Sequence, residues 1–304
     1  MSNQNFTVIT SITEYHRLLE LDKPQHPLVS IIDFSAVTYV NPTEDISIVM
    51  DLYFISIKQN PDCVLRYGPK HYDFTEGVMS FIKPGQVLTV ERGSSPVTEG
   101  FSLVFHPDFI RSFPLASKLK NYAFFDYEVN EALFLSEREK VHIRSLMAGI
   151  MQEYNNNIDR FSQEAIVVFI ELLLVYGNRY YNRQFITRKS NNEHYVVKFE
   201  TMLESYFSSG KLLESGLPNV KYFAEQLHMS PNYLSDLLRL YTGQSAQGHI
   251  QDRLIEQAKT LLTTSHLSVA EISYMLGFEQ PQSLNRLFKK KTNMSPVQFR
   301  QSFN

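Results

Sequence analysis

The sequence predicts an α+β protein, with a strand-rich N-terminal half followed by helices and an all-α C-terminal domain. Three observations carry this prediction. Short runs of β-branched and aromatic residues, separated by turn signals, fill residues 45–106. Two long segments with apolar residues at helical spacing follow, between residues 136 and 183. From Val220 onward one pattern occurs twice: a short amphipathic helix, a tight turn, a second helix and a helix stop.

Length and composition limit the class of protein. A chain of 304 residues with 43% hydrophobic and 20% charged residues has room for two globular domains. The first residues lack the features of a signal peptide, and the most apolar run, Ala165–Tyr176, is too short to span a bilayer and contains Glu171. The single cysteine, Cys63, excludes an intramolecular disulfide and a cysteine-rich zinc site. We therefore expect a cytoplasmic protein without a membrane partner.

The strands come first. Turn signals such as Asn60-Pro61 and Lys83-Pro84-Gly85 separate the candidate strands, and this spacing indicates a small antiparallel barrel or sandwich. The candidate strands lie within Ile46–Lys58, Val78–Ile82, Val87–Val90 and Phe101–Phe105.

Aromatic residues are frequent in this half of the chain. They could line a pocket for a small-molecule effector, with Arg66, Lys70 or His71 as the polar anchor, or they could fill a closed barrel that holds no ligand. The sequence leaves both interpretations open. The candidate pocket residues are Tyr53, Arg66, Tyr67, His71, Tyr72 and Phe74.

Two helices follow the strands. Ser136 and Glu139 form a capping box that begins a helix reaching about Tyr154, and a second helix runs from about Phe161 to Arg183. The apolar stripe of the second helix is too wide for one partner surface, so it packs on the strands and the preceding helix and, in the sharper interpretation, also on a second subunit. The candidate dimerisation residues are Phe161, Ala165, Phe169, Leu172, Leu173 and Tyr176. Residues 186–193 are polar and unpatterned, which predicts a linker between domains 1–185 and 194–304.

The repeated pattern organises the C-terminal domain. When Val220–Ile250 is laid on Val269–Arg300, equivalent residues are 49 positions apart before the central turn and 50 after it. Ser230-Pro231 is a strong helix start, and Gly243 and Asn293 stand where each second helix needs a left-handed stop. The expected helices are 194–208, 220–227, 231–241, 250–263, 269–275, 281–292 and 296–303.

The second helix of a helix-turn-helix can lie in the major groove of DNA, so the repeat predicts nucleic-acid binding. Residues 194–304 carry 11 Lys and Arg against 9 Asp and Glu, whereas residues 1–193 carry 18 against 23. This asymmetry has the expected sign but is small. The local run Lys289–Lys291 with Arg286 one turn before it is more informative. The candidate phosphate contacts are Arg239, Lys289, Lys290 and Lys291.

The C-terminal residues resemble the AraC/XylS family of bacterial transcription regulators. The resemblance covers about Val196–Phe303 and is most specific in the second unit. The residues that carry it there are Ala270, Ile272, Gly277-Phe278, Ser283, Phe288-Lys289-Lys290, Ser295-Pro296 and Phe299-Arg300. It implies two helix-turn-helix units that enter successive major grooves on one face of the DNA, held apart by the helix between them. One turn of B-DNA is about 34 Å, which a helix of about 21 Å with its flanking turns can bridge.

The resemblance also assigns base-reading positions by their place in the two recognition helices. Gln282 can bond adenine and Arg286 can grip guanine, each with two hydrogen bonds. Asp236 departs from the family pattern: it could accept a hydrogen bond from cytosine, cap its own helix or remain solvated. The full set of candidate base contacts is Asn232, Ser235, Asp236, Pro281, Gln282, Ser283 and Arg286.

The N-terminal half resembles, more loosely, the cupin-like sensor domain of many such regulators, a β barrel followed by two dimerising helices. The paired histidines of metal-binding cupins are absent: His71 precedes Tyr72-Asp73, and His106 precedes Pro107. We therefore expect no metal, no cofactor and no enzymatic activity.

These observations predict a sequence-specific transcription regulator, an activator and a homodimer, whose helices 231–241 and 281–292 read double-stranded promoter DNA. RNA polymerase and a small-molecule effector are further candidate partners. The alternative within this class is a constitutive regulator whose N-terminal domain only dimerises. A DNA-repair fusion would need activated cysteines, and Cys63 has no companion. A cupin enzyme would need the missing metal ligands.

Overall fold

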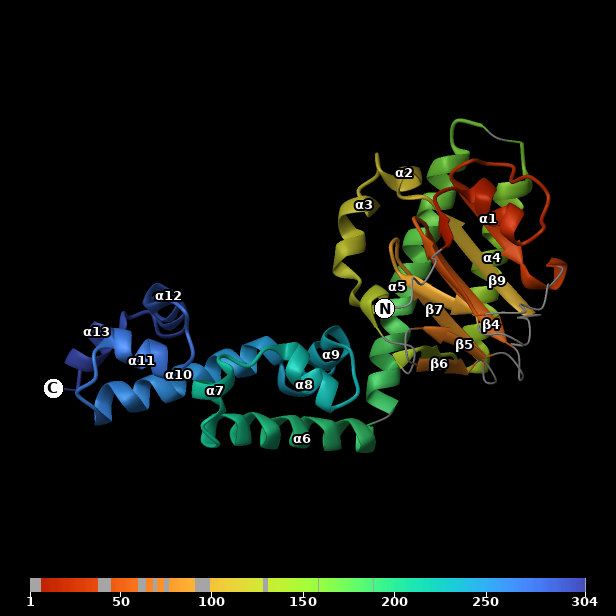
Figure 1. The fold of residues 1–304 in the computed structure, drawn as a ribbon. Helices are drawn as coiled ribbons and strands as arrows, with labels where there is room; N and C mark the ends of the chain where they lie inside the picture. The colour runs from red at the N-terminus through yellow and green to blue at the C-terminus, as the bar shows by residue number, and fades with distance from the viewer. Residues whose placement is uncertain are drawn as a thin grey trace. The chain divides into compact units, whose positions relative to one another are not determined.

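The structure is a computed structural model. It describes residues 7–37, 45–59, 64–67, 70–73, 77–90, 99–127, 131–157, 159–187 and 189–303, without the side chains of residues 59–73, 189–191 and 213. The chain divides into two compact units, Met1–Thr187 and Arg188–Asn304. The first unit contains the sheets and the second is helical (Figure 1).

Two five-stranded sheets form the centre of the N-terminal unit. One has the strand order β1-β3-β8-β5-β6 and the other β10-β7-β4-β9-β2. All the neighbouring strands pair antiparallel except β1 and β3, which are parallel. The strands are β1 (Thr7–Ile9), β2 (Val29–Asp33), β3 (Ile46–Met50), β4 (Tyr53–Gln59), β5 (Val64–Tyr67), β6 (Lys70–Asp73), β7 (Val78–Ile82), β8 (Val87–Val90), β9 (Glu99–Phe105) and β10 (Leu133–Phe134).

The hydrophobic core of this unit lies between the two sheets. Ile48 and Leu88 come from one sheet, Phe54 and Val104 from the other, and Ile12 from the first helix closes one end. Each of these side chains is less than 9% exposed. Because side chains alternate along a strand, the neighbours of these residues face away from the core, toward helices or solvent.

Helices cover the outer face of the second sheet. Helix α4 (Glu137–Asn155) begins at the predicted capping box, where the Ser136 backbone N–H donates to Glu139 Oε2 at 2.8 Å. Helix α5 (Ser162–Thr187) packs on β10, where Arg183 donates to the Phe134 carbonyl at 2.7 Å. The remaining helices of this unit are short: α1 (Ile12–Leu18), η1 (Phe34–Ala36), α2 (Pro107–Ile110), α3 (Leu115–Lys118), η2 (Leu119–Asn121) and η3 (Ala123–Asp126).

The closed barrel we predicted is not found among the described strands, whose ladders form two separate sheets. The run Ile46–Lys58, which we expected to be one strand region, bends at Asp51-Leu52, so that β3 and β4 enter different sheets. The interpretation as a sandwich, left open by the sequence, fits the described strands. The strands and helix that precede residue 45 were not predicted at all, because β1 is only three residues long and pairs with a distant segment.

The C-terminal unit is built on helix α10 (Ala246–Thr264), which joins the two helix-turn-helix units. Figure 1 shows α10 running from the α8 and α9 pair to the α11 and α12 pair. Arg300 stabilises the C-terminal end of α10. Its guanidinium donates to the carbonyls of Leu262, at 3.1 Å, and Leu267, at 2.6 Å. The other helices are α6 (Lys189–Ser208), α7 (Lys211–Ser215), α8 (Val220–Gln226), α9 (Pro231–Thr242), α11 (Val269–Met275), α12 (Pro281–Thr292) and α13 (Pro296–Gln301).

Three helix boundaries differ from the prediction by four residues or more. The segment 186–193, expected to be a linker, ends α5 at Thr187 and forms the start of α6 from Lys189. Its polar residues gave no apolar periodicity, but a solvent-facing helical turn needs none. Helix α10 begins at Ala246 rather than at residue 250, because Ser245 caps it by accepting a hydrogen bond from the Gly248 backbone N–H.

Candidate nucleic-acid interface

The first recognition helix, α9, buries one face and exposes the other. Ser230 caps it through a 3.1 Å hydrogen bond from the Tyr233 backbone N–H, and Gly243 ends it in the left-handed conformation. Leu234 and Leu237 are fully buried. Among the predicted base contacts, Asn232, Ser235 and Asp236 are half-buried and lie off this buried face. The helix therefore holds them on the side that a DNA groove could reach.

The second recognition helix, α12, has the same design. Leu284 and Phe288 are fully buried, and Asn293 ends the helix at a φ of 60°. The predicted base contacts Gln282, Ser283 and Arg286 are exposed, and Pro281 is half-buried at the first helical position. The predicted phosphate contacts Lys289 and Lys290 are also exposed, one turn beyond Arg286.

One exposed residue of this face was missed. Asn285 lies on α12 between Gln282 and Arg286 and is exposed. It stands 50 positions after Ser235, which was predicted to read bases, so the offset of the repeat could have found it. A side-chain amide both donates and accepts hydrogen bonds, and it can bond adenine in the major groove.

The acidic residue of α9 pairs with the basic residue of the same helix. Asp236 and Arg239 form an ion pair between positions i and i+3. Asp236 does not cap the helix start, which Ser230 does. On α12, Arg286, Lys289 and Lys290 have no acidic residue among them. The two recognition helices therefore differ in charge, and the second carries most of the positive charge available to phosphates.

This pair yields a prediction about DNA affinity. Asp236→Asn frees Arg239, so we expect tighter binding to every duplex and a log K against log salt slope steeper by about 0.9 per phosphate gained. Titrations at several salt concentrations measure both quantities. The control is Glu279→Gln, which removes one exposed charge beside α12 without freeing an arginine and should leave the slope unchanged. Weaker binding of Asp236→Asn to the preferred duplex alone would instead show that the carboxylate accepts from cytosine.

The turn inside each helix-turn-helix requires a left-handed residue. His228 fills this position in the first unit, at a φ of 57°, and Gly277 in the second, at 82°. A Cβ on Gly277 would come within 3.0 Å of the backbone of Gly216 and Leu217. The glycine thus permits the left-handed backbone conformation. It also permits a close contact between the second helix-turn-helix and the segment before α8.

We expect Gly277→Ala to lower the free energy of unfolding by about 1–3 kcal/mol through backbone strain, and further through the close contact. Gly243→Ala is the matched control, because Gly243 has a φ of 76° but nothing within 4 Å of a Cβ. Chemical denaturation of both variants measures the difference. Equal losses would show that the contact with Gly216 and Leu217 contributes nothing.

The third predicted lysine lies elsewhere. The ammonium of Lys291 is 2.6 Å from Asp252 Oδ1 on α10, and its side chain is 25% exposed. It therefore ties α12 to the connecting helix, whereas Lys289 and Lys290 face solvent. Among the predicted phosphate contacts on α12, Lys291 is the one that the geometry does not support.

The predicted dimerisation residues of the N-terminal unit divide between two faces. Phe161 is 55% exposed and Leu172 36%, whereas Leu173 is fully buried and cannot contact a partner. The prediction for Leu173 is thus corrected: the wide stripe contains both the internal packing face and an exposed one. Phe169, Tyr176 and Ala165 are half-buried. Phe169 lies over Gly149 of α4, and Tyr176 meets the His142 ring at 4.1 Å.

Two exposed residues on α5 were not among the predicted dimerisation residues. Val168 is 59% exposed and Val175 49%. With Phe161 they recur every seven residues, and Ala165 and Leu172 form the alternate row, which is the spacing of a helix–helix seam. The exposed stripe therefore consists of Phe161, Ala165, Val168, Leu172 and Val175.

The predicted effector pocket is not assembled by the described residues. Tyr53 stacks on Phe105 with ring centroids 5.1 Å apart and meets Phe125 edge-on, on the outer face of its sheet. Its ring therefore lies outside the space between the sheets, whereas the predicted pocket needed the ring to face that space. Arg66, Tyr67, His71 and Tyr72 belong to β5 and β6, but their side chains and all of Phe74 lie outside the described residues.

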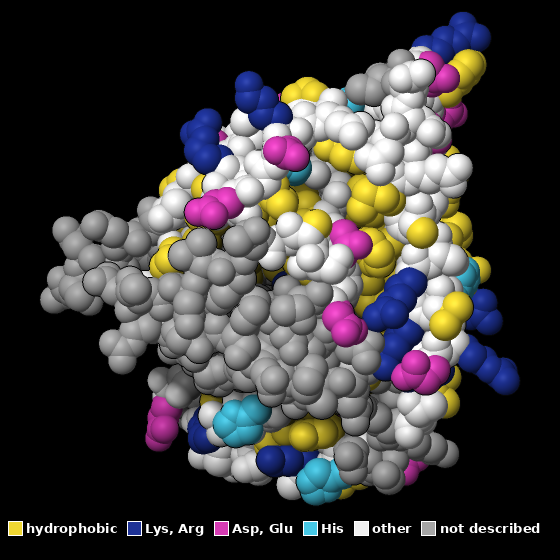
Figure 2. Space-filling model, turned by 90° about the vertical axis from the view of Figure 1, so that its right-hand side faces the viewer, with side chains coloured by type: hydrophobic (Ala, Val, Ile, Leu, Met, Phe, Trp, Pro, Cys, Tyr) yellow, Lys and Arg dark blue, Asp and Glu magenta, His cyan; other side chains and the backbone are white. Residues whose placement is uncertain are grey.

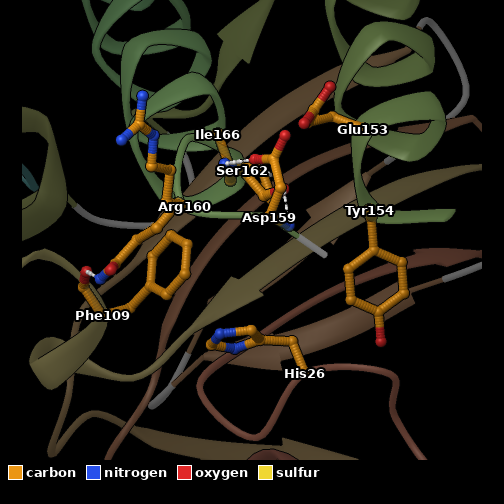
Figure 3. A pocket seen from close by; sticks show the side chains of 9 residues that line it. His26, Phe109, Glu153, Tyr154, Asp159, Arg160, Ser162 and Ile166 are labelled. Atoms are coloured by element: carbon orange, nitrogen blue, oxygen red, sulfur yellow. Dashed lines mark hydrogen bonds between the residues drawn. The ribbon is translucent and has the colours of Figure 1, made fainter. Parts of the chain in front are cut away.

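A cavity of about 200 Å³ lies at another place in this unit, where the loop before β2, α2 and the facing ends of α4 and α5 meet. In Figure 3, Phe109 and Tyr154 stand on opposite sides, with His26 below and Glu153 and Asp159 above. His26 Nδ1 accepts from the Leu28 backbone N–H at 3.0 Å, and burial lowers the pKa of its imidazole. No residue of the predicted pocket lines this cavity.

Charge does not mark a single-sign surface on the face shown in Figure 2. Lys and Arg side chains lie among Asp and Glu side chains there, with hydrophobic side chains between them. In the part of the chain that the structure describes, no group of three or more His, Cys, Asp or Glu side chains is placed to hold a metal ion. No described helix is long and apolar enough to cross a membrane.

Known proteins resemble parts of this chain. Residues 223–302 match the family model described as a helix-turn-helix domain. The arabinose operon regulatory protein of Escherichia coli is 38% identical over 77 residues, 25% of this chain and 26% of that protein. The uncharacterized regulator YobQ of Bacillus subtilis is 31% identical over 116 residues, 36% of this chain and 48% of that protein. The transcriptional activator RhaS of Salmonella agona is 24% identical over 176 residues, 58% of this chain and 57% of that protein.

Each match spans less than two thirds of the relative's length. The matched family model ends at residue 302, and it contains both recognition helices, the connecting helix between them and the ends that cap each one. The C-terminal helix-turn-helix domain, residues 223–302, is therefore of the AraC/XylS type found in transcription regulators.

Proposed function

We propose that the protein is a sequence-specific, dimeric transcription regulator that reads two successive major grooves of promoter DNA with α9 and α12. The observation that carries this proposal is the repeated geometry of the two helices. Each buries an apolar face, starts with proline and ends in a left-handed residue. Each thereby presents polar side chains on its opposite face, at its N-terminal half, which is the half that reaches base edges.

The contacts divide into two kinds. Gln282, Asn285 and Arg286 carry the groups that read bases in the major groove, whereas Lys289 and Lys290 lie one turn further along and neutralise phosphates. Asn232 and Ser235 read bases in the first groove. Because α9 has a paired Asp236 and Arg239, the first unit contributes more to sequence preference than to electrostatic attraction.

Dimerisation through α5 completes the proposal. The exposed stripe from Phe161 to Val175 leaves apolar side chains in contact with solvent over about four helical turns in one subunit. A second copy would cover it by the same stripe, as a two-fold interface requires. Two linked domains bind two DNA sites far more tightly than one domain does.

Control by a small molecule is the finer part of the proposal, and the cavity beside Phe109 is the observation that favours it. It combines aromatic walls with the carboxylate of Glu153, for which no ion pair occurs among the described residues. We expect a metabolite that fills the cavity to raise the thermal midpoint of the wild type but not of Glu153→Gln. The same rise in both would place the ligand elsewhere.

The direction of regulation is a separate part of the proposal. RhaS is named an activator, and we propose activation, through RNA polymerase, for this protein also.

The test of sequence-specific binding is enrichment of duplexes from a random pool by the full chain. We expect one recurrent site with two conserved blocks, and affinity for that site about 10³-fold or more above that for a scrambled duplex. A pool that stays random after selection, with equal affinity for every duplex, would contradict the proposal.

A further inference from the structure

One carboxylate on the connecting helix contacts the ends of both recognition helices. Asp252 Oδ1 is 2.6 Å from the ammonium of Lys291, in the last turn of α12. Asp252 Oδ2 accepts a 2.6 Å hydrogen bond from the side-chain amide of Gln244, the second residue after α9. Each carboxylate oxygen of Asp252 thus contacts a residue at the end of a different recognition helix.

The side chain of Gln244 can reach Asp252 only because the residue between them on α10 is a glycine. Gly248 stands inside α10, four residues after Gln244 and four before Asp252, and a Cβ there would lie 2.5 Å from Gln244 Cγ. Glycine inside a helix costs about 1 kcal/mol relative to alanine, so its presence at this position needs a reason. The reason here is space: the side chain of Gln244 lies where the methyl group of an alanine would be.

The junction between α9 and α10 is fixed by a second contact. Thr242 Oγ1 lies 2.7 Å from His249 Nε2, and the Gln244 backbone N–H donates to the same hydroxyl at 3.3 Å. Gln244 is therefore held at its backbone as well as at its side-chain amide. A displacement of Asp252 would be transmitted to the end of α9.

Asp252 remains ionised at neutral pH. Its partial burial disfavours the charge, but hydrogen bonds from Gln244 and Lys291 and the charge of Lys291 outweigh this and lower the pKa of the carboxyl. An isolated exposed ion pair contributes little to stability. The significance of this pair therefore lies in which elements it joins.

We infer that Asp252 is a positioning residue that fixes the separation of the two recognition helices, together with Gln244, Gly248 and Lys291. Both helices can then enter their grooves only when the two blocks of the DNA site are a set number of base pairs apart. This inference rests on the proposed reading of two successive grooves. Lys291 acts here through Asp252, not by contact with phosphate. Loss of these contacts leaves both helices able to bind but lets their separation vary.

The test compares duplexes that differ only in spacing. The full chain is titrated against the site selected by the wild type and against the same site with one base pair inserted between its two blocks. One inserted pair rotates the second block by about 35° around the DNA. We expect the wild type to prefer the original spacing by about tenfold. For Asp252→Asn and Gly248→Ala we expect this preference to fall to about threefold or less.

The control is Glu256→Gln. It removes the same charge one turn further along α10, but Glu256 pairs at 2.7 Å with Lys259 of the same helix, and among the described residues it has no ion pair with another element. Its spacing preference should equal that of the wild type. The exchange Asp252→Lys with Lys291→Asp should restore the preference, because the amide of Gln244 can present its oxygen instead of its nitrogen.

The outcomes separate the inference from the proposed function. A steep wild-type preference that is unchanged in Asp252→Asn and Gly248→Ala would overturn the positioning role and leave two-groove reading intact. A wild type that binds both spacings equally would refute two-groove reading itself, and the positioning role with it. Thermal unfolding of each variant, expected to match the wild type within a few degrees, shows that the change in preference is not a loss of fold.

Discussion

Arg286→Ala is expected to weaken binding to the selected site by about 1–3 kcal/mol and to relax the base preference at one or two positions. The side chain is exposed on α12, a helix that contains no acidic residue, and it lies in the first half of the helix. Titration on the selected site and on single-base variants of it measures both effects. Gln282→Ala should act in the same way at a neighbouring base pair.

Lys290→Ala is the matched control, because it removes one positive charge from the same helix one turn further along. We expect it to weaken binding to selected and scrambled duplexes alike and to flatten the log K against log salt slope by about 0.9. If Arg286→Ala also weakens both duplexes equally, then Arg286 is a phosphate contact and the base-reading assignment for α12 is wrong.

Val168→Glu and Leu172→Glu are expected to convert the protein to a folded monomer. Both residues belong to the exposed stripe of α5, so a charge there costs little in the free subunit but would be buried in a dimer interface. Sedimentation at tens of micromolar measures the mass, and a monomer should bind the DNA site at least about tenfold more weakly.

Asn178→Glu is the control for this experiment. It places the same charge on an exposed position of α5 that flanks the stripe, and it should leave the dimer intact. Leu173→Glu, by contrast, should unfold the unit, because that side chain is fully buried. A wild type that sediments as a monomer would show that α5 forms no dimer interface.

The C-terminal domain was predictable because its signals are local. Ser230, Pro231 and Gly243 mark helix ends through contacts within a few residues, and the second copy repeats the pattern. The same locality limited the prediction. Asn285 was missed although its counterpart Ser235 had been chosen, and Lys291 was grouped with its neighbours although its partner Asp252 is 39 positions away.

The N-terminal unit was less predictable because its structure depends on distant pairing. Apolar spacing marked α5 as a helix, but it could not show that Leu173 is buried while Val168 is exposed. Nor could aromatic content locate a pocket: Tyr53 packs on Phe105, and the cavity is lined by residues from four separate segments. Only the folded arrangement brings His26, Phe109 and Tyr154 together.

The reading of two successive major grooves is tested most directly by interference from methylation of guanine N7, an atom exposed in the major groove. On the selected site bound by the full chain, we predict two clusters of interfering guanines, centred about 10–10.5 base pairs apart on one face of the DNA. In Arg286→Ala, the cluster that belongs to α12 should weaken while the other persists. A single cluster, or interference spread evenly along the site, would contradict the reading of two successive major grooves.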